Sequence, residues 1–236
     1  MIDLHCHILP GIDDGPIEMQ TSIDMARIAA EDGITTIVAT PHIKDILHPT
    51  VKLRALISQL NIHLEKKNIP VKVLLGGDVF ALLSPSRLKD YTINNSRYIL
   101  IEFPHNYLPS NSKEILFSLA MHGLCPIITH PERNQAIMKR PDLLFDMLYG
   151  NVLVQITSGS LTGEFGLHEQ ACAIYLLKKE AVHFIATDAH STDSRRPELS
   201  NGLKLAGKII GMENAMKLVW DNPCSVLKDE PILSTY

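Results

Sequence analysis

Short β-branched runs alternate with longer amphipathic segments along the whole chain, and this alternation limits the fold more than any other feature. Apolar strands are expected at 2–5, 34–39, 71–75, 98–101, 126–128, 152–156 and 183–186. Amphipathic helices are expected at 16–33, 51–64, 113–122, 141–149, 167–179, 202–210 and 213–220. Continuously apolar strands separated by helices are typical of a parallel sheet covered by helices. The alternation therefore predicts an α/β protein, built either as an open doubly wound sheet or as a closed β/α barrel.

Composition excludes two broad classes of protein. The chain has 236 residues, 22 Lys and Arg against 26 Asp and Glu, and a net charge of −4. No basic run suggests nucleic-acid binding, and no stretch approaches the roughly 20 apolar residues of a membrane span. No linker-like tract interrupts the sequence, so a single domain over 1–236 is expected. With no secretory signal and four widely spaced cysteines, we expect reduced thiols and a cytoplasmic location.

Several of the expected strands end in a residue that can bind a metal. His5 and His7 lie two apart in the first strand and so share a face, with Asp3 beside them. From His7, the following candidates come after gaps of 35, 36, 24, 28 and 58 residues. These candidates are His42, Asp78, Glu102, His130 and Asp188, with His190 just beyond the last. A gap of about 30 residues is one β–α unit, so these side chains return to the same rim of the sheet.

Such a gathering of imidazoles and carboxylates predicts a catalytic metal centre. Carboxylates collected in a cleft repel one another, and divalent cations relieve that repulsion. Cys6 is the sole cysteine near the set and points to the opposite strand face, which favours Mn, Fe or Zn in a catalytic role over a structural zinc. Asp14 is a further candidate ligand, and Asp13 is interpreted as a loop residue or a support for the ligands rather than a ligand. His105 is interpreted as a solvated or structural histidine, with a place on the pocket rim as the less favoured alternative.

The ordered motifs are identified as those of a known family. They are Asp3-Leu4-His5-Cys6-His7, Asp13-Asp14-Gly15, Thr40-Pro41-His42, Ile101-Glu102-Phe103, His130-Pro131-Glu132-Arg133 and Asp188-Ala189-His190. Together they resemble the polymerase-and-histidinol-phosphatase (PHP) superfamily, in its bacterial capsule and exopolysaccharide branch of metal-dependent protein-tyrosine phosphatases of the CpsB/YwqE type. The resemblance covers nearly the whole chain and implies an α/β fold of the PHP kind, a distorted (β/α)7 TIM-like barrel.

The resemblance also implies a site with three divalent metal ions, usually manganese, with Fe or Zn as alternatives. It assigns His5, His7, Asp78 and Asp188 to the first ion, and Asp78, Glu102 and His130 to the second. Asp14, His42 and His190 are assigned to the third. Arg133 and a second arginine are expected to contact phosphate, so the catalytic set is completed by Glu102, Arg133 and either Arg195 or Arg196.

The sequence departs from the family pattern at one ligand and leaves one arginine open. The family usually has Glu at the position of Asp78, which is one methylene shorter. A carboxylate that bridges two metals there must either bring its backbone closer or bind one metal. Arg195 matches the second family arginine by its distance from Asp188, whereas Arg196 matches by preceding Pro197. We favour Arg195 slightly.

These residues predict a metal-dependent phosphoric monoester hydrolase. Bound divalent ions lower the pKa of water from about 15.7 toward roughly 7, which supplies hydroxide to attack phosphorus while arginine clamps the phosphate. A tyrosine leaving group, with a pKa of about 10, departs without a strong general acid. We therefore expect a protein-tyrosine phosphatase whose partner is a phosphotyrosine protein, a bacterial tyrosine kinase of capsule or exopolysaccharide synthesis.

Two alternatives remain open from the sequence. The first is a small-molecule phosphatase, such as a histidinol-phosphate phosphatase, which would use the same metals on a different substrate. The second is a catalytically weak module that binds phosphorylated proteins, because the change at Asp78 could have removed activity. Neither nucleic acid nor insertion into a membrane is expected for any of these readings.

Overall fold

The computed structural model describes residues 1–44, 47–84 and 88–232. Within them, strands that pair only in parallel form the centre of the molecule. The strands are β1 (Ile2–Cys6), β2 (Thr36–Ala39), β3 (His42–Ile43), β4 (Lys72–Leu75), β5 (Asp78–Phe80), β6 (Tyr98–Glu102), β7 (Cys125–Thr129), β8 (Leu153–Thr157) and β9 (Phe184–Ala186). The predicted parallel α/β fold class is therefore confirmed.

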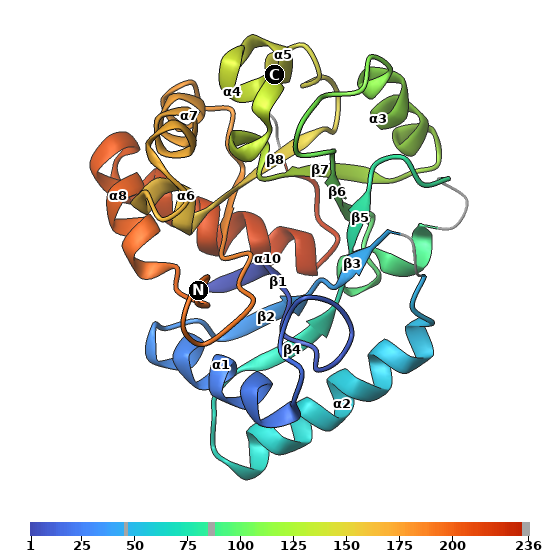
Figure 1. Ribbon diagram of the computed structural model, residues 1–236, viewed down its shortest axis with the longest axis vertical. Helices are drawn as coiled ribbons and strands as arrows, with labels where there is room; N and C mark the ends of the chain where they lie inside the picture. Colours follow the sequence, from blue (N-terminus) through green and yellow to red (C-terminus); the bar gives the residue numbers. More distant parts are fainter. Residues whose placement is uncertain (45–46, 85–87, 233–236) are drawn as a thin grey trace.

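Helices lie around the outside of these strands (Figure 1). They are α1 (Met19–Glu31), α2 (Thr50–Lys66), α3 (Ser112–Met121), α4 (Gln135–Lys139), α5 (Asp142–Phe145), α6 (Ser158–Thr162), α7 (Leu167–Lys178), α8 (Ser200–Ile210), α9 (Met212–Met216) and α10 (Asn222–Leu227). Short helical turns add η2 (Lys89–Tyr91), η3 (Ile93–Asn95), η4 (Pro131–Arg133) and the π-helical η5 (Lys217–Asp221). No helix of the described ranges is both long enough and apolar enough to cross a membrane.

The strands are divided between two sheets. One has the order β1-β2-β4 and the other the order β3-β5-β6-β7-β8-β9. The chain passes from the first sheet to the second twice, from β2 to β3 and from β4 to β5. On the other side, β1 meets the segment after β9 through a single parallel bridge between Cys6 and Ala189. The two sheets together carry the repeated β–α units that the sequence predicts.

Two helix predictions need correction. The helix expected at 141–149 is reduced to α5, because the segment after Phe145 turns back toward β8. The chain was also expected to end its helices before Pro223, but α10 begins at Asn222 with Pro223 in its first turn. Proline is well suited to that position, since its missing N–H would have no partner inside the helix.

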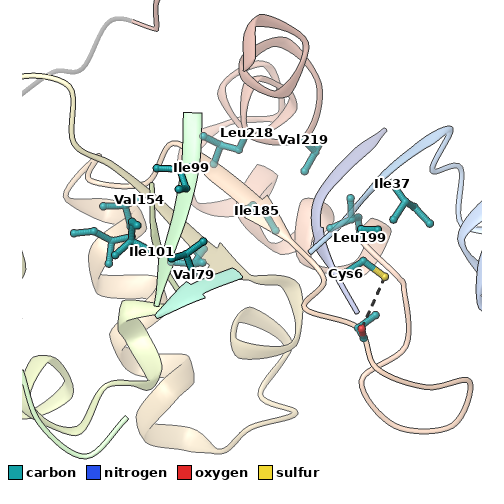
Figure 2. Close-up of a cluster of buried hydrophobic side chains, with 14 of the residues drawn as sticks. Cys6, Ile37, Val79, Ile99, Ile101, Val154, Ile185, Leu199, Leu218 and Val219 are labelled. Atoms are coloured by element: carbon teal, nitrogen blue, oxygen red, sulfur yellow. Dashed lines mark hydrogen bonds between the residues drawn. The ribbon is translucent and has the colours of Figure 1, made fainter. Parts of the chain in front are cut away.

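The outer faces of the strands pack against the helices in one large apolar cluster. Ile99 and Ile101 of β6 point outward into it, as do Val154 of β8 and Ile185 of β9 (Figure 2). Cys6 also belongs to this cluster, on the far side of β1 from the neighbouring histidines. This placement agrees with the predicted orientation of the Cys6 side chain.

The inner faces of the strands enclose a second, smaller cluster. Tyr98 and Leu100 alternate with the outward residues of β6, as expected for a strand buried on both faces. Their partners are Ile2, Leu4, Val38, Ile93, Cys125, Ile127, Leu153, Phe184 and Val226. Val226 comes from α10, so this last helix covers the apolar end of the interior.

The outer edge of β4 is capped by a side chain of α2. Asn61 Nδ2 donates to the Val73 carbonyl at 2.9 Å, and Asn61 Oδ1 accepts the Val73 N–H at 2.9 Å. A groove of about 850 Å³ runs along this edge, lined by residues that include Arg54, Ile57 and Glu65. The amide of Asn61 thus occupies a backbone donor and acceptor that no neighbouring strand uses.

His183 provides a test of the packing at the start of β9. Burial lowers its pKa to about 4, so the folded chain keeps His183 neutral where the unfolded chain, with a pKa near 6.5, binds a proton. Stability from this group is present above pH 6.5 and is lost as the pH falls toward 4. Between pH 7 and pH 5, we expect the wild type to lose about 2 kcal/mol of unfolding free energy that His183→Gln does not lose.

Urea unfolding in the presence of a chelator measures this difference without a contribution from bound metal. The control is His122→Gln, because His122 is exposed at the end of α3. Its loss between pH 7 and pH 5 should equal that of the wild type. Equal losses for wild type and His183→Gln would contradict the burial of a neutral imidazole at this position.

Candidate metal centre

Nine side chains meet at the carboxyl ends of the strands. Each offers a ligand atom to at least one group whose ligand atoms lie within 4.8 Å of one another. In the part of the chain that the structure describes, no other His, Cys, Asp or Glu joins such a group. The nine are His5, His7, Asp14, His42, Asp78, Glu102, His130, Asp188 and His190. These are the same nine residues that the sequence motifs single out.

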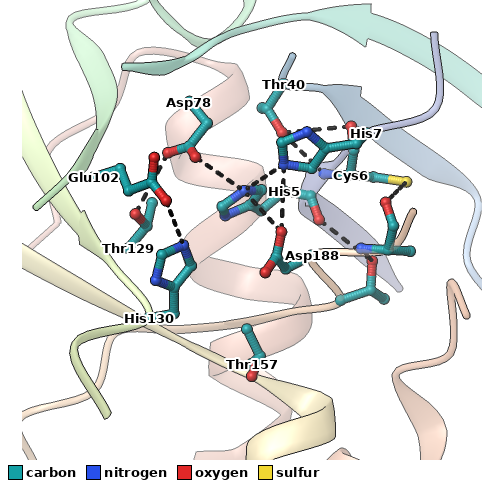
Figure 3. Close-up of polar contacts among 12 residues, drawn as sticks. His5, Cys6, His7, Thr40, Asp78, Glu102, Thr129, His130, Thr157 and Asp188 are labelled. Atoms are coloured by element: carbon teal, nitrogen blue, oxygen red, sulfur yellow. Dashed lines mark hydrogen bonds and ion pairs between the residues drawn. The ribbon is translucent and has the colours of Figure 1, made fainter. Parts of the chain in front are cut away.

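Asp188, His5 of β1 and His7 just after β1 form the centre of the site (Figure 3). Asp188 Oδ1 lies 3.4 Å from His5 Nε2 and 3.3 Å from His7 Nε2. The two Nε2 atoms are 3.2 Å apart. Three potential ligand atoms of buried side chains therefore face one another at distances that a single cation could span.

Asp78 lies between two further groups. Its Oδ2 atom is 3.1 Å from His42 Nδ1 and 3.8 Å from His5 Nε2. Glu102 Oε2 is 3.5 Å from the same His42 nitrogen, and Glu102 Oε1 is 3.9 Å from His130 Nε2. Asp78 consequently belongs both to the group with His5 and His130 and to the group with His42 and Glu102.

Asp14 completes a group at the mouth of the site. Its Oδ1 atom is 3.3 Å from His190 Nε2 and 3.6 Å from His42 Nε2. The side chain of Asp14 is 61% exposed, which is more than the side chains of its ion-pair partners His42 and His190. His7 shares this group with Asp14, His42 and His190, whereas the family resemblance places His7 with Asp188. In the structure His7 belongs to both groups.

Acceptors outside the centre fix the orientation of its histidines. His5 Nδ1 donates to Gln155 Oε1 at 2.9 Å, and His7 Nδ1 donates to Asp13 Oδ2 at 2.7 Å. His190 Nδ1 donates to the Asp188 carbonyl at 2.9 Å. With Nδ1 as the donor, each ring presents Nε2 to the site, which is the usual arrangement around a bound metal.

Asp13 therefore supports the site rather than joining it, as the sequence predicts. Besides His7, its carboxylate accepts the backbone N–H of His42 at 3.0 Å and of Gly15 at 3.1 Å. A Cβ on Gly15 would lie 2.2 Å from the His7 carbonyl oxygen. Only glycine allows the loop to approach β1 this closely, so the loop that carries Asp14 depends on Gly15.

Asp3 differs from its expected place. The sequence places it beside His5 and His7, but the register of β1 shifts between Asp3 and Cys6. Asp3 instead accepts hydrogen bonds from the Thr187 N–H at 3.0 Å and the Thr187 hydroxyl at 2.5 Å. Burial raises the pKa of Asp3 to about 7, and these bonds oppose that rise. Asp3 therefore connects β1 to the residue that follows β9 and is not one of the candidate ligands.

Buried ligand atoms that form no hydrogen bond indicate that these residues suit bound cations. His42 Nδ1, Asp78 Oδ2, Glu102 Oε2 and His190 Nε2 are buried and form no hydrogen bond, and their close contacts are with charged or imidazole neighbours alone. Leaving a buried polar atom without a hydrogen bond is costly, and native proteins rarely leave several together. Imidazole nitrogens and carboxylate oxygens are also the donors that Mn, Fe and Zn prefer. The donor set therefore fits divalent metal ions.

The acidic groups perturb one another strongly. Burial, and next the charge of Asp78, raise the pKa of Glu102 to about 7. Burial alone would raise the pKa of Asp78, but the surrounding histidines, His5 first, outweigh it and hold the pKa below its usual range. Burial and the charge of His7 lower the pKa of His190 to about 4. Cations would relieve the repulsion that keeps Glu102 partly protonated near neutral pH.

Two arginines approach the centre from the side opposite His5. Arg133 Nη1 and Arg195 Nη2 each donate to Asp188 Oδ2 at 2.5 Å. Asp188 thus faces the histidines with one oxygen and the arginines with the other. Arg196 does not contact Asp188. Its Nη2 is 2.9 Å from Glu198 Oε1, and it lines a separate pocket that contains none of the nine candidate ligands. Of the two alternatives left open by the sequence, the structure brings Arg195 to the site.

Left-handed backbone conformations position three of these residues. His130, Asp188 and Arg195 have φ angles of 32°, 53° and 49°. This region costs a residue with a Cβ about 1–3 kcal/mol and concentrates at functional sites. His130 directly follows β7, and Asp188 is the second residue after the end of β9.

A cavity of about 300 Å³ is lined by several of the candidate ligands. Its lining also includes the two arginines and Phe80, Phe103, Pro104 and His105. His105 lines the cavity, which was the less favoured of the two alternatives for this residue. Lys44 also reaches the cavity, with its Nζ 3.3 Å from Glu102 Oε2. The larger groove beside β4 contains none of the nine candidate ligands, so its size does not make it the site.

Sequence reasoning missed two residues that hold the site together. The sequence motifs give Gln155 no role, yet its Oε1 accepts the His5 Nδ1–H and so fixes that ring. Asn134 accepts the N–H groups of Ala136 and Ile137 and donates to the Pro104 and Tyr107 carbonyls at 2.7 and 3.0 Å. It joins the start of α4 to the cavity rim. An Asn just before a helix is a recognisable capping signal, but its contact with the rim is not readable from sequence.

Comparisons with known proteins agree with this geometry. Residues 1–228 match the family described as capsular polysaccharide synthesis, CpsB/CapC. The tyrosine-protein phosphatase YwqE of Bacillus subtilis is 39% identical over 221 residues, covering 90% of this chain and 86% of YwqE. The tyrosine-protein phosphatase CpsB of Streptococcus agalactiae is 28% identical over 243 residues, covering 98% of this chain and 100% of CpsB.

A solved structure is also similar over almost the full length. It comes from crystal structures of YwqE from Bacillus subtilis and CpsB from Streptococcus pneumoniae, described as unique metal-dependent tyrosine phosphatases. The TM-score is 0.92 at 36% sequence identity, covering 99% of this chain and 96% of that chain. The arrangement of strands that brings the nine candidate ligands together is therefore shared with a metal-dependent enzyme.

Removal of metal should lower thermal stability. An ion present at about 100 times its dissociation constant stabilises the fold by about 2.7 kcal/mol, which for a chain of this size is about 5–10 °C in Tm. We expect a chelator to lower the Tm of metal-loaded protein by at least this much, and added divalent metal to restore it. Differential scanning calorimetry with elemental analysis of the same samples measures both quantities.

Two carboxylate variants make this test specific. Asp78→Asn removes a ligand atom common to two groups and should shrink the shift in Tm. Asp24→Asn removes a partly exposed carboxylate of α1, which pairs with Arg27 and belongs to none of the ligand groups, and should leave the shift unchanged. An unaltered Tm of the wild type after complete metal removal would count against a shared metal site.

Proposed function

The chain belongs to the CpsB/CapC family of capsular polysaccharide synthesis, and on this basis we propose that it is a metal-dependent protein-tyrosine phosphatase. The observation that carries the proposal is the convergence of nine candidate metal ligands and two arginines on one cavity. The relatives named as tyrosine phosphatases span nearly the whole chain, which favours this activity over the alternatives of a small-molecule phosphatase or a binding module.

The residues of the site suit the hydrolysis of a phosphate monoester. Bound divalent ions would supply charge compensation and lower the pKa of water. Arg133 and Arg195 offer N–H donors to the non-bridging oxygens of the phosphate. The hydrogen bonds from these donors would strengthen as negative charge develops on those oxygens. Phe80 and Pro104 contribute apolar surface to the cavity, against which an aromatic ring of the substrate could pack.

We propose that the site takes three ions, with manganese the expected metal. The overlapping ligand groups and the donor chemistry support this number and this metal. Asp14, Asp78, Glu102 and Asp188 carry four negative charges when ionised, and three divalent ions would leave a net charge of +2. That excess, together with Arg133 and Arg195, suits a phosphate dianion.

In this proposal Asp78 would help to hold two ions, since it belongs to two ligand groups, although its side chain is short. Gly76 and Gly77 precede it between β4 and β5, and a Cβ on Gly76 would lie 2.7 Å from Val38 Cγ1. A Cβ on Gly77 would lie 3.0 Å from Ile43 Cγ1. The glycines let the backbone that leads into Asp78 run close to β2 and β3. A closer backbone is what a carboxylate one methylene shorter needs in order to reach both groups.

The proposed partner is a phosphotyrosine protein, a tyrosine kinase of capsule or exopolysaccharide synthesis. The family description and the named activity of the relatives support a tyrosine-phosphorylated substrate in this process. We also propose a cytoplasmic location. The four cysteines are all free in the structure, as expected for a reducing compartment where disulfides are rare.

Substrate preference tests the proposed activity. Metal-loaded protein should hydrolyse a phosphotyrosyl peptide with a kcat/KM about tenfold or more above that for histidinol phosphate. The physical reasons are the phenol leaving group, which departs more easily than an aliphatic alcohol, and the apolar cavity wall. Release of inorganic phosphate from each substrate, measured under the same metal load, decides the matter. Faster turnover of histidinol phosphate would replace the proposed activity with that of a small-molecule phosphatase.

Adjacent arginines provide a matched test of phosphate binding. Arg195→Ala should lower kcat/KM for the phosphotyrosyl peptide by about 10²–10³, because it removes a donor to the charge that develops on phosphate. Arg196→Ala removes a partly exposed ion pair with Glu198 and should stay within about threefold of the wild type. Metal content per chain is measured for both variants. Equal losses in the two variants would contradict the assigned role of Arg195.

A further inference from the structure

Two guanidinium groups converge on a single carboxylate oxygen at the cavity. Arg133 and Arg195 both donate to Asp188 Oδ2, while Oδ1 of the same residue faces His5 and His7. Two like charges held this close repel each other, and one shared oxygen compensates them only in part. Another group must help to keep both side chains turned toward the cavity.

The aromatic ring of Phe165 lies against both arginines. The Arg133 Cζ is 4.3 Å from the ring centroid, and the Arg195 Cζ is 5.9 Å from it. The face of an aromatic ring carries partial negative charge and attracts cations within about 6 Å. This contact stabilises a guanidinium group without using its N–H donors. The edges of both groups therefore stay available for an anion.

An unpaired donor independently indicates where an anion would bind. Arg195 Nε is buried and forms no hydrogen bond. Burying such a donor without an acceptor is unfavourable, and a phosphate oxygen is an acceptor that guanidinium groups bind well. The arginine pair is thus held in place before any anion arrives, with at least one donor unused.

The loop that carries Phe165 is fixed on both sides. Glu164 Oε1 accepts the backbone N–H of Arg195 at 2.9 Å, and the backbone N–H of Glu164 donates to the Gly159 carbonyl at 2.9 Å. A Cβ on Gly159 would lie 2.7 Å from Phe165 Cε2, so glycine is needed for the ring to rest on α6. The ring is therefore a fixed surface rather than a freely rotating side chain.

We propose that Phe165 is a positioning residue that holds Arg133 and Arg195 together as one phosphate clamp. The proposal rests on the proposed phosphatase function, because it takes the phosphate group as the ligand of the two arginines. Phe165 does not touch the phosphate itself. It acts through the orientation of the two guanidinium planes, which the ring and Asp188 hold from two sides.

Binding of inorganic phosphate to the metal-loaded protein tests this role without requiring turnover. Phe165→Leu keeps apolar bulk but removes the aromatic face, and should raise the Kd for phosphate about three- to thirtyfold, as measured by calorimetric titration. Phe165→Tyr keeps the ring face and should bind within about twofold of the wild type. Phe117→Leu, at an exposed phenylalanine of α3, is the matched control and should bind as the wild type does.

A double-mutant cycle shows whether Phe165 acts through the arginines. In an Arg133→Ala background, the loss from Phe165→Leu should fall to less than half of its value in the wild type. A residue with only a structural role would give the same loss in both backgrounds, together with a lower Tm or less bound metal. Unchanged phosphate affinity in Phe165→Leu, equally weak binding in Phe165→Tyr, or an equal loss in both backgrounds would each overturn the proposal.

Failure of the proposed function gives a different result. If the protein does not hydrolyse phosphotyrosyl peptides but Phe165→Leu still weakens phosphate binding, the clamp stands and the substrate assignment falls. If the protein hydrolyses them and Phe165→Leu binds phosphate normally, the assignment stands and the role of Phe165 falls.

Discussion

Repulsion among buried acidic groups is the constraint on which the rest of this structure depends. Asp78, Glu102 and Asp188 lie at one end of the strands with little water to screen them, and each is compensated by imidazole, arginine or lysine. Asp188 has the most divided role, because one of its oxygens faces histidines and the other faces arginines. A cation bound at the first oxygen and an anion bound by the arginines would therefore be linked through a single carboxylate.

The interior supports this arrangement in layers. Apolar side chains such as Leu100 and Ile127 fill the end of the interior that α10 covers, and uncharged polar groups follow above them. Thr129 donates to the Ile101 carbonyl at 3.3 Å and lies 3.4 Å from Asp78 Oδ1, while Gln155 holds His5. Burial of the apolar layers favours folding. The polar layer gives the charged groups hydrogen-bond partners whose positions are fixed by the surrounding packing.

The location of the site could be predicted from the sequence because the β–α unit repeats at a nearly constant length. That period places the residue after each strand at the same rim, and all nine candidate ligands meet there. The shifted register of β1, which turns Asp3 to Thr187, depends on contacts with β2 and β9 and has no local signal. The contact between Phe165 and Arg133 is likewise non-local. The extent of a single domain over 1–236, the number of ions and the phosphate contacts remain predictions.

The amide of Asn61 has a consequence for how molecules of this protein meet one another. β4 ends its sheet, and an unprotected edge of this kind can template the addition of a strand from another copy. By satisfying both the N–H and the carbonyl of Val73, Asn61 leaves an incoming strand without partners at the middle of that edge. One uncharged side chain of α2 therefore opposes strand addition at this point of the edge, beside the charged Arg54 and Glu65 that line the same groove.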